Sequence, residues 1–337
     1  MTSFRSLAAS WFCVAVVAFA PETAAQCLGA GRLVAEEPPQ VEGLILASGP
    51  MARVGRGRMV APVMVNGRGP FRFIIDTGAN RSAMSQGLAN ELGLTPFGTG
   101  EVHSIDGVSQ APLVAAQSLQ YGDVSLAAAA MPLLDGSMMA GQQGLLGVDG
   151  MRGLRLRMDF DRRCIEIAAS SQARRLSGWM TLRGELRFGH LVLVPGRVEN
   201  LSVNIFIDTG SDSTLANIAL RDQLRDNRRV RVERIDPARA YTAGHAIVLD
   251  SLLLLPRISM GRIEARNVQA YVGNFHIFDL WNLSDEPALL IGMDVLSQTG
   301  GVAIDYDRAT VHFRLRQALW TGSRLPGSSR AGINVGQ

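Results

Sequence analysis

The chain has 337 residues, of which 47% are hydrophobic and 19% are charged, and its formal net charge is +3. This length is ample for two hydrophobic cores, and many short apolar segments broken by Gly and Pro favour strands over helices. All 33 basic residues are arginine, which excludes enzymes that need a P-loop, Schiff-base or kinase lysine. The small net charge, without interleaved aromatic and basic residues, predicts no nucleic-acid partner.

The first 25 residues have the pattern of a secretory signal peptide. Arg5 precedes an apolar stretch from Leu7 to Ala20, which is short for a membrane span, and small residues lead to Ala24-Ala25. We therefore expect a signal peptide at 1–25, a periplasmic or secreted protein, and no stable membrane insertion after cleavage. The alternative is a protein anchored by an uncleaved N-terminal helix.

An Asp-Thr-Gly tripeptide occurs twice, and each copy ends an apolar run that is predicted to be a buried strand. The copies are Asp76-Thr77-Gly78 and Asp208-Thr209-Gly210. A buried carboxylate is costly unless it has partners, so two carboxylates in matched contexts indicate a site that uses both.

The surroundings of the two tripeptides match as well. Upstream of each, a strand and turn are predicted, at Val63 to Phe71 and at His190 to Leu201, where Pro195-Gly196 is the expected turn. Downstream, short helices are predicted at 85–94, ending near Gly93, and at 216–224. Two further motifs recur in the same order, Leu145-Leu146-Gly147-Val148-Asp149 with Leu290-Ile291-Gly292-Met293-Asp294, and Asp159-Phe160-Asp161-Arg162 with Asp305-Tyr306-Asp307-Arg308.

Four landmarks in one order indicate an internal repeat, and hence two lobes in one chain. We expect a flexible N-terminal arm at 26–49, lobe one at 50–170, a linker at 171–177, lobe two at 178–316 and a disordered tail at 317–337. Because the repeat supplies both halves of the site, we expect a monomer.

The run from Ile75 to Ala79, the following helix that ends Leu92-Gly93-Leu94, and the later Leu145-Leu146-Gly147 resemble the retropepsin-like aspartyl proteases. The resemblance covers about residues 55 to 315. It implies an all-β fold of two pseudo-symmetric retropepsin-like β-barrel lobes with short helices, and an aspartic endopeptidase that cleaves polypeptides. The second copy departs from the pattern, with Ser211 where the first has Ala79.

The resemblance also implies how the paired motifs act. Asp76 and Asp208 are the predicted catalytic pair, sharing one proton and activating one water without a cofactor or a metal. Thr77 and Thr209 have hydroxyls that can cross-link the two loops, although threonine is also common in strands. Small Gly78 and Gly210 allow backbone to pack against the carboxylates. Gly147 and Gly292 are predicted to support the site as the second motif.

Ser211 suggests which aspartate carries the charge. Its hydroxyl can donate a hydrogen bond toward Asp208, whereas Ala79 cannot help Asp76 in this way. We therefore expect Asp208 to be the base and Asp76 the acid.

Two turn sequences are candidate flaps over the site. His103 to Gly107 lies between strand-like runs in lobe one, and Tyr241 to His245 holds the same place in lobe two, with Gly107 and Gly244 in the turns. Ordinary β-turns are the alternative.

Cysteine and histidine carry less information. The alternation at Cys164-Ile165-Glu166-Ile167 predicts Cys164 on the outer face, where a disulfide to Cys27 is possible and two unrelated thiols are the alternative. The five histidines show no zinc-binding spacing.

Two functions remain open. One is an exported aspartic endopeptidase; the other is a catalytically silent protease-like module that binds peptides or protein partners. The presence of both aspartates favours the enzyme, because a binding module has no evident need for two desolvated carboxylates.

Overall fold

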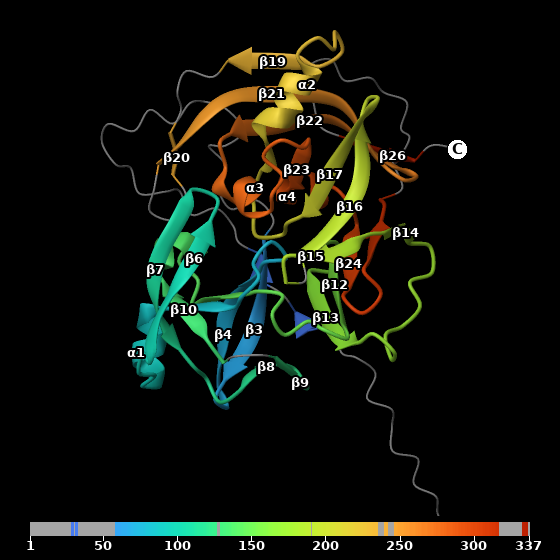
Figure 1. Ribbon diagram of the computed structural model, residues 1–337. Coiled ribbons are helices and arrows are strands. Elements are labelled where there is room, and N and C mark those ends of the chain that lie inside the picture. The colour runs from blue at the N-terminus through green and yellow to red at the C-terminus, as the bar shows by residue number, and fades with distance from the viewer. Residues whose placement is uncertain are drawn as a thin grey trace, which may run out of the picture.

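The computed structural model describes residues 58–126, 129–189, 191–234 and 246–316, with the backbone of short strand segments at 28–29, 31–32, 239–241 and 332–335. Strands dominate, and the helices are few and short, which confirms the predicted all-β class with two lobes. Three sheets hold the strands: one in each lobe and one shared between the lobes (Figure 1).

The sheet of lobe one has ten strands. They are β2 (Gly31–Arg32), β3 (Met59–Val65), β4 (Arg68–Ile75), β5 (Ala83–Ser85), β6 (Gly98–Ser104), β7 (Gly107–Val114), β8 (Leu119–Tyr121), β9 (Val124–Leu126), β10 (Met131–Leu134) and β11 (Gly144–Leu146). The hairpin β3–β4 turns at Asn66-Gly67, where both residues have positive φ, as the predicted Gly-containing turn requires. Phe73 and Ile75 on β4 are buried in the core, which fixes the position of the strand. Asp76 follows directly after this strand.

The sheet of lobe two also has ten strands. They are β15 (Glu185–Arg187), β16 (Leu191–Val198), β17 (Leu201–Ile207), β18 (Thr214–Ala216), β19 (Arg231–Arg234), β20 (Arg239–Tyr241), β21 (Ala246–Met260), β22 (Ile263–Gly273), β23 (Ala288–Ile291) and β26 (Gly332–Val335). The lobe rises above lobe one in Figure 1, with the long ribbon β21–β22 across its top.

The turn predicted at Pro195-Gly196 is wrong. Both residues lie inside β16 and pair with Asn204 and Val203, and the chain reverses after Val198, where Glu199 has positive φ. Pro195 is tolerated because β16 has a partner strand on only one side at that point. Gly196 is small because a Cβ there would lie 2.3 Å from Ile205 Cδ1.

The two predicted short helices are confirmed. Helix α1 (Gln86–Leu92) is capped by the Ser85 side chain and ends at Gly93, whose φ of 68° is the left-handed C-cap that favours glycine. Helix α2 (Ile218–Leu224) is capped by Asn217, whose side chain accepts from the amide of Leu220. The remaining helical segments are the 3-10 turn η2 (Gly136–Met139), α3 (His276–Leu280) and α4 (Met293–Leu296).

The third sheet joins the two halves of the chain. Its six strands run in the order β1 (Leu28–Gly29), β13 (Cys164–Ala169), β12 (Leu154–Asp159), β24 (Gly301–Asp305), β25 (Thr310–Arg314) and β14 (Met180–Arg183). At its centre β12 pairs antiparallel with β24, and Arg157 lies opposite Ala303. Because these strands end the two repeats, a pseudo-two-fold axis passes through this pairing.

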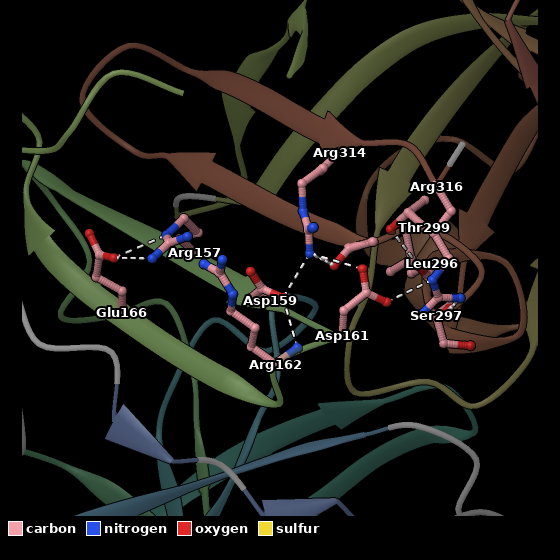
Figure 2. Close-up of polar contacts among 11 residues, drawn as sticks. Arg157, Asp159, Asp161, Arg162, Glu166, Leu296, Ser297, Thr299, Arg314 and Arg316 are labelled. Atoms are coloured by element: carbon pink, nitrogen blue, oxygen red, sulfur yellow. Dashed lines mark hydrogen bonds and ion pairs between the residues drawn. The ribbon is translucent and has the colours of Figure 1, made fainter. Parts of the chain in front are cut away.

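The repeated Asp-aromatic-Asp-Arg turns close the strands of this sheet. In each turn the first aspartate accepts from the backbone amide of the arginine three residues on, at 2.9 Å for Arg162 and 3.0 Å for Arg308. Arg314 also bridges the repeats, because its Nη2 lies 2.7 Å from Asp159 Oδ1 and 3.1 Å from Asp161 Oδ2 (Figure 2). The turns therefore hold one lobe to the other.

Cys164 corrects one prediction. It is 6% exposed and not on an outer face, because β13 is covered on both sides and its side chains do not alternate between core and solvent. Cys164 forms a disulfide, and the other two cysteines, Cys13 and Cys27, lie outside the described residues.

The predicted signal peptide at 1–25 also lies outside the described residues, as do most of the predicted arm and tail. Strands β1 and β2 in the arm and β26 in the tail have described backbone, and each pairs with a strand of the sheets. Among the described residues, no helix is long and apolar enough to cross a membrane. The lobe boundaries and the monomeric state stay predictions.

Candidate active site

The two Asp-Thr-Gly loops follow the central strands of the two lobes and are anchored in the same way. In lobe one, β11 lies between β4 and β5, parallel to the first and antiparallel to the second, and the carbonyl of Leu146 accepts from the amide of Asp76 at 3.0 Å. In lobe two, β23 lies between β17 and β18, and Ile291 accepts from the amide of Asp208 at 3.0 Å. In each lobe, a carbonyl on the strand of the second motif therefore binds the backbone amide of the aspartate.

Thr77 and Thr209 hold the loops together across the lobes. The Thr77 hydroxyl donates to the carbonyl of Ile207 at 2.7 Å and accepts from the amide of Thr209 at 3.1 Å. The Thr209 hydroxyl donates to Ile75 at 2.8 Å and accepts from the amide of Thr77 at 3.2 Å. Both side chains are buried, so four hydrogen bonds shielded from water fix the spacing of the neighbouring aspartates.

The glycines of the tripeptides make room for the carboxyl group of the opposite lobe. A Cβ on Gly78 would lie 2.6 Å from Asp208 Cγ, and a Cβ on Gly210 would lie 2.2 Å from Asp76 Cγ. Both distances are far below van der Waals contact, so any larger residue would push the carboxyl groups apart. The structure therefore brings Asp76 and Asp208 together, each packed on the other's loop.

The two carboxyl groups differ in their preference for a proton. Burial raises the pKa of Asp208 well above its usual range, the negative charge of Asp76 raises it further, and the amide of Gly210 offsets this only in part. Burial raises the pKa of Asp76 as well, but the Gly78 amide, a hydrogen bond with the Asp208 carboxyl and the charge of Arg58 lower it. The two carboxyls can therefore share one proton, and Asp208 is the one whose pKa is raised well above its usual range.

The hydrogen bond expected from Ser211 to Asp208 is not formed. The Ser211 hydroxyl donates to the carbonyl of Ser213 at 2.8 Å, so its one proton is not available to Asp208. Asp76, in contrast, is supported by the amides of both Gly78 and Ala79. Burial and the charge of Asp76 raise the pKa of Asp208, which favours Asp76 as the charged member of the pair.

A second pair of carboxylates supports the loops, and the sequence analysis gave it no role. Asp149 accepts from the Ser82 hydroxyl at 2.8 Å, and Asp294 accepts from the Thr214 hydroxyl at 2.9 Å. In turn these hydroxyls accept from the amides of Gly147 at 3.1 Å and Gly292 at 3.4 Å. The sequence contains a signal for these pairs. A hydroxyl residue follows Asp76 and Asp208 by six positions, and an aspartate follows Gly147 and Gly292 by two.

Gly147 and Gly292 lie where the second motif passes close to the Asp-Thr-Gly loops. A Cβ on Gly147 would lie 2.5 Å from the backbone of Arg81, and one on Gly292 would lie 2.5 Å from the carbonyl oxygen of Ser213. The residues after them then bond to the loops, Val148 to Ala79 at 2.9 Å and Met293 to Ser211 at 2.8 Å. The two glycines therefore support the geometry of the site.

Arg58 was also missed by the sequence analysis. It lies directly before β3 in lobe one, and its Nη2 is 2.9 Å from Asp212 Oδ2 in lobe two. Its positive charge lowers the pKa of both Asp76 and Asp208. Nothing in its local sequence marks this role, because the partner lies in the other repeat.

The candidate flap of lobe one is a β-hairpin. Strands β6 and β7 pair from Gly98 opposite Leu113 to Ser104 opposite Gly107. The turn ends at Gly107, whose φ of 147° is open to glycine and strained for other residues. The tip contacts lobe two, where the amide of His276 donates to the carbonyl of Ile105 at 2.9 Å. In lobe two Tyr241 pairs with Ala246, and Gly244 lies outside the described residues.

The described residues contain no group of three or more His, Cys, Asp or Glu side chains that could hold a metal ion. What they contain is a pair of interacting carboxyls between two β lobes, held by matched loops. This fold and site define a two-lobed, retropepsin-like aspartyl protease.

Comparison with known families agrees with that class. The family profile described as Aspartyl protease matches residues 61–149 and 194–295, one segment in each lobe and more than half of the chain together. The chain belongs to this family. A search of curated proteins found no match.

Proposed function

We propose that the chain is an exported aspartic endopeptidase that cleaves extended polypeptide segments by activating a water between Asp76 and Asp208. The observation that carries the proposal is the direct contact of two carboxyls, with Asp208 buried and Asp76 half-buried, whose pKa values are both raised by desolvation. A carboxyl pair of this kind supplies a base and an acid at the same place. A module that only binds peptides has no need of this costly arrangement.

The order of the proton transfers follows from the site. Asp76, which carries the charge, takes a proton from the water as the oxygen attacks the scissile carbonyl. Asp208, which holds the shared proton, donates it to the developing oxyanion. The proton taken by Asp76 then passes to the leaving amine as the C–N bond breaks, and Asp208 regains a proton from a hydroxyl of the tetrahedral intermediate. The pair returns to its starting state without a covalent intermediate.

An extended polypeptide is the substrate that suits these lobes. Strand edges can pair with the backbone of an extended peptide, and the hairpin β6–β7 is the flap that would cover it. The disulfide at Cys164 supports export, because such bonds persist in oxidising compartments. We propose Cys27 as its partner and a monomer as the working form, since the chain carries both Asp-Thr-Gly motifs.

The test is incubation of the purified mature chain with a library of peptides, followed by mass spectrometry of the products. We expect internal cleavage that a pepstatin-type inhibitor blocks and that the Asp76→Asn variant lacks. Binding of peptides without cleavage by the native chain would contradict the endopeptidase and support the silent binding module.

A further inference from the structure

Two histidines join the flap of lobe one to lobe two. His103 lies near the tip of β6, and its Nδ1 is 2.9 Å from Nε2 of His276, the first residue of α3. The rings lie edge to edge in nearly one plane, with centroids 5.3 Å apart and planes inclined by 13°. The backbone hydrogen bond from His276 to Ile105 lies beside them, so side chains and backbone connect the same two elements.

The pair depends on its protonation state. A neutral imidazole has one donor and one acceptor nitrogen, so two neutral rings, or one neutral and one charged ring, can form the observed contact. When both rings are charged, all four nitrogens are donors, and the two facing nitrogens repel each other. The contact is therefore compatible with up to one added proton and incompatible with two.

The acidic residues on the two elements are Glu101, Asp106 and Asp279. Glu101 Oε2 lies 3.7 Å from His103 Nε2. Asp106 in the turn accepts from the Ser104 hydroxyl, and Asp279 on α3 accepts from the Ser284 hydroxyl. On β7 the residue opposite His103 is Val108, which has no charge.

We propose that His103 and His276 form a pH-sensitive latch, which holds the flap against lobe two at neutral pH and releases it when acid adds the second proton. The inference rests on the proposed function, in which β6–β7 covers the substrate. Histidine is suited to this role because its ordinary pKa, about 6.5, lies between neutral and mildly acidic pH. Acidification then opens the site for peptide entry.

The test measures the contact without relying on catalysis. Hydrogen exchange of the His276 amide is followed by NMR in the Asp76→Asn chain at pH 7.5 and pH 4.5, as protection relative to the intrinsic rate at each pH. We expect its protection to fall by about tenfold or more on acidification, because two unit charges at this separation repel strongly near a protein surface. The amide of Trp281, bonded to Ile277 within the lobe-two segment, should keep its protection.

Matched variants identify the groups responsible. His276→Gln and His103→Gln keep a polar side chain but cannot gain a charge, so the fall in His276 protection should vanish in both. His312→Gln removes a histidine of β25 that bonds to Thr181 and Thr310, and the fall should remain. Unchanged protection in the parent chain, an equal fall in the two flap variants, or a parallel fall at Trp281 would each overturn the latch.

Peptide cleavage separates this inference from the proposed function. If the latch opens in acid and no peptide is cleaved, the endopeptidase is wrong and the latch stands as a pH-sensitive contact. If peptides are cleaved and the protection of His276 does not change, the latch is wrong and the endopeptidase stands. In an active chain, His276→Gln should reduce the change of KM between pH 7.5 and pH 4.5 more than the change of kcat.

Discussion

The two lobes carry the same supporting framework and yet hold their catalytic-type carboxyls differently. Threonine, glycine and the hydroxyl–carboxylate pairs repeat almost bond for bond on the two sides. The two carboxyls differ in pKa, because the charge of Asp76 and the hydrogen bond with it raise the pKa of Asp208, whereas the hydrogen bond with Asp208 lowers the pKa of Asp76. Symmetry thus sets the position of the pair, and the interaction between the two carboxyls favours one shared proton.

The largest expected effect is on the two aspartates themselves. Asp76→Asn and Asp208→Asn should each lower kcat for peptide cleavage by at least about 100-fold, since each removes one partner of acid–base catalysis. Asp76→Asn should be the more severe, because it removes the charged base. Asp285→Asn, at an exposed carboxyl of lobe two, is the control. Full activity in either site variant would contradict a shared pair.

Substitution of the two threonines tests whether both contribute equally to stability, as their matched hydrogen bonds suggest. Thr77→Val and Thr209→Val each leave one buried amide and one buried carbonyl without a partner, so each should lower the free energy of unfolding by about 2–4 kcal/mol. Urea unfolding measures both. Thr77→Ser and Thr209→Ser keep the hydroxyl and should lower the free energy of unfolding much less. Losses that differ by more than about 1 kcal/mol between the lobes would show unequal support.

Asp294 provides a pH test of the framework of lobe two. Burial raises its pKa from 3.8 to about 6, against the hydrogen bonds from Thr214. Between those values the folded chain holds a proton that the unfolded chain has lost, so the free energy of unfolding falls as pH rises, by up to about 3 kcal/mol. Asp294→Asn should remove this part of the pH dependence, measured by urea unfolding from pH 4 to pH 7. Its counterpart Asp149→Asn is the control and should retain it; an unchanged slope in Asp294→Asn would contradict the assignment.

The smallest effect concerns the glycines that separate the loops. Gly78→Ala and Gly210→Ala place a methyl group against the opposite carboxyl and should lower the free energy of unfolding by about 1–2 kcal/mol. Gly210→Ala should cost more, because its Cβ would approach to 2.2 Å against 2.6 Å. Thermal unfolding compares them with Gly87→Ala in α1, where the nearest atom is 4.0 Å away and a gain of about 0.5–1 kcal/mol is expected. A neutral result at both loop positions would mean that the carboxyls can move apart freely.

Local signals in the sequence were strong where a short motif dictates a local structure. Ser85 and Gly93 bound α1 as capping residues do, and the Asn66-Gly67 turn closes its hairpin. The prediction of a turn at Pro195-Gly196 was wrong because these residues are explained by tertiary features. Gly196 packs against Ile205, and the strand around Pro195 is paired on one side only. The prediction that Cys164 lies on an outer face was wrong for a similar reason. Strand β13 is covered on both sides, so side chains on both of its faces are buried.

By itself the sequence determined the repeat, the all-β class, the two Asp-Thr-Gly loops and the family, because each depends on the order and spacing of residues along the chain. Tertiary structure alone decided how closely Asp76 and Asp208 approach each other and which lobe-two residues meet Arg58 and His103. Those properties depend on hydrogen bonds and burial between segments more than a hundred residues apart, and distance along the chain carries no information about them.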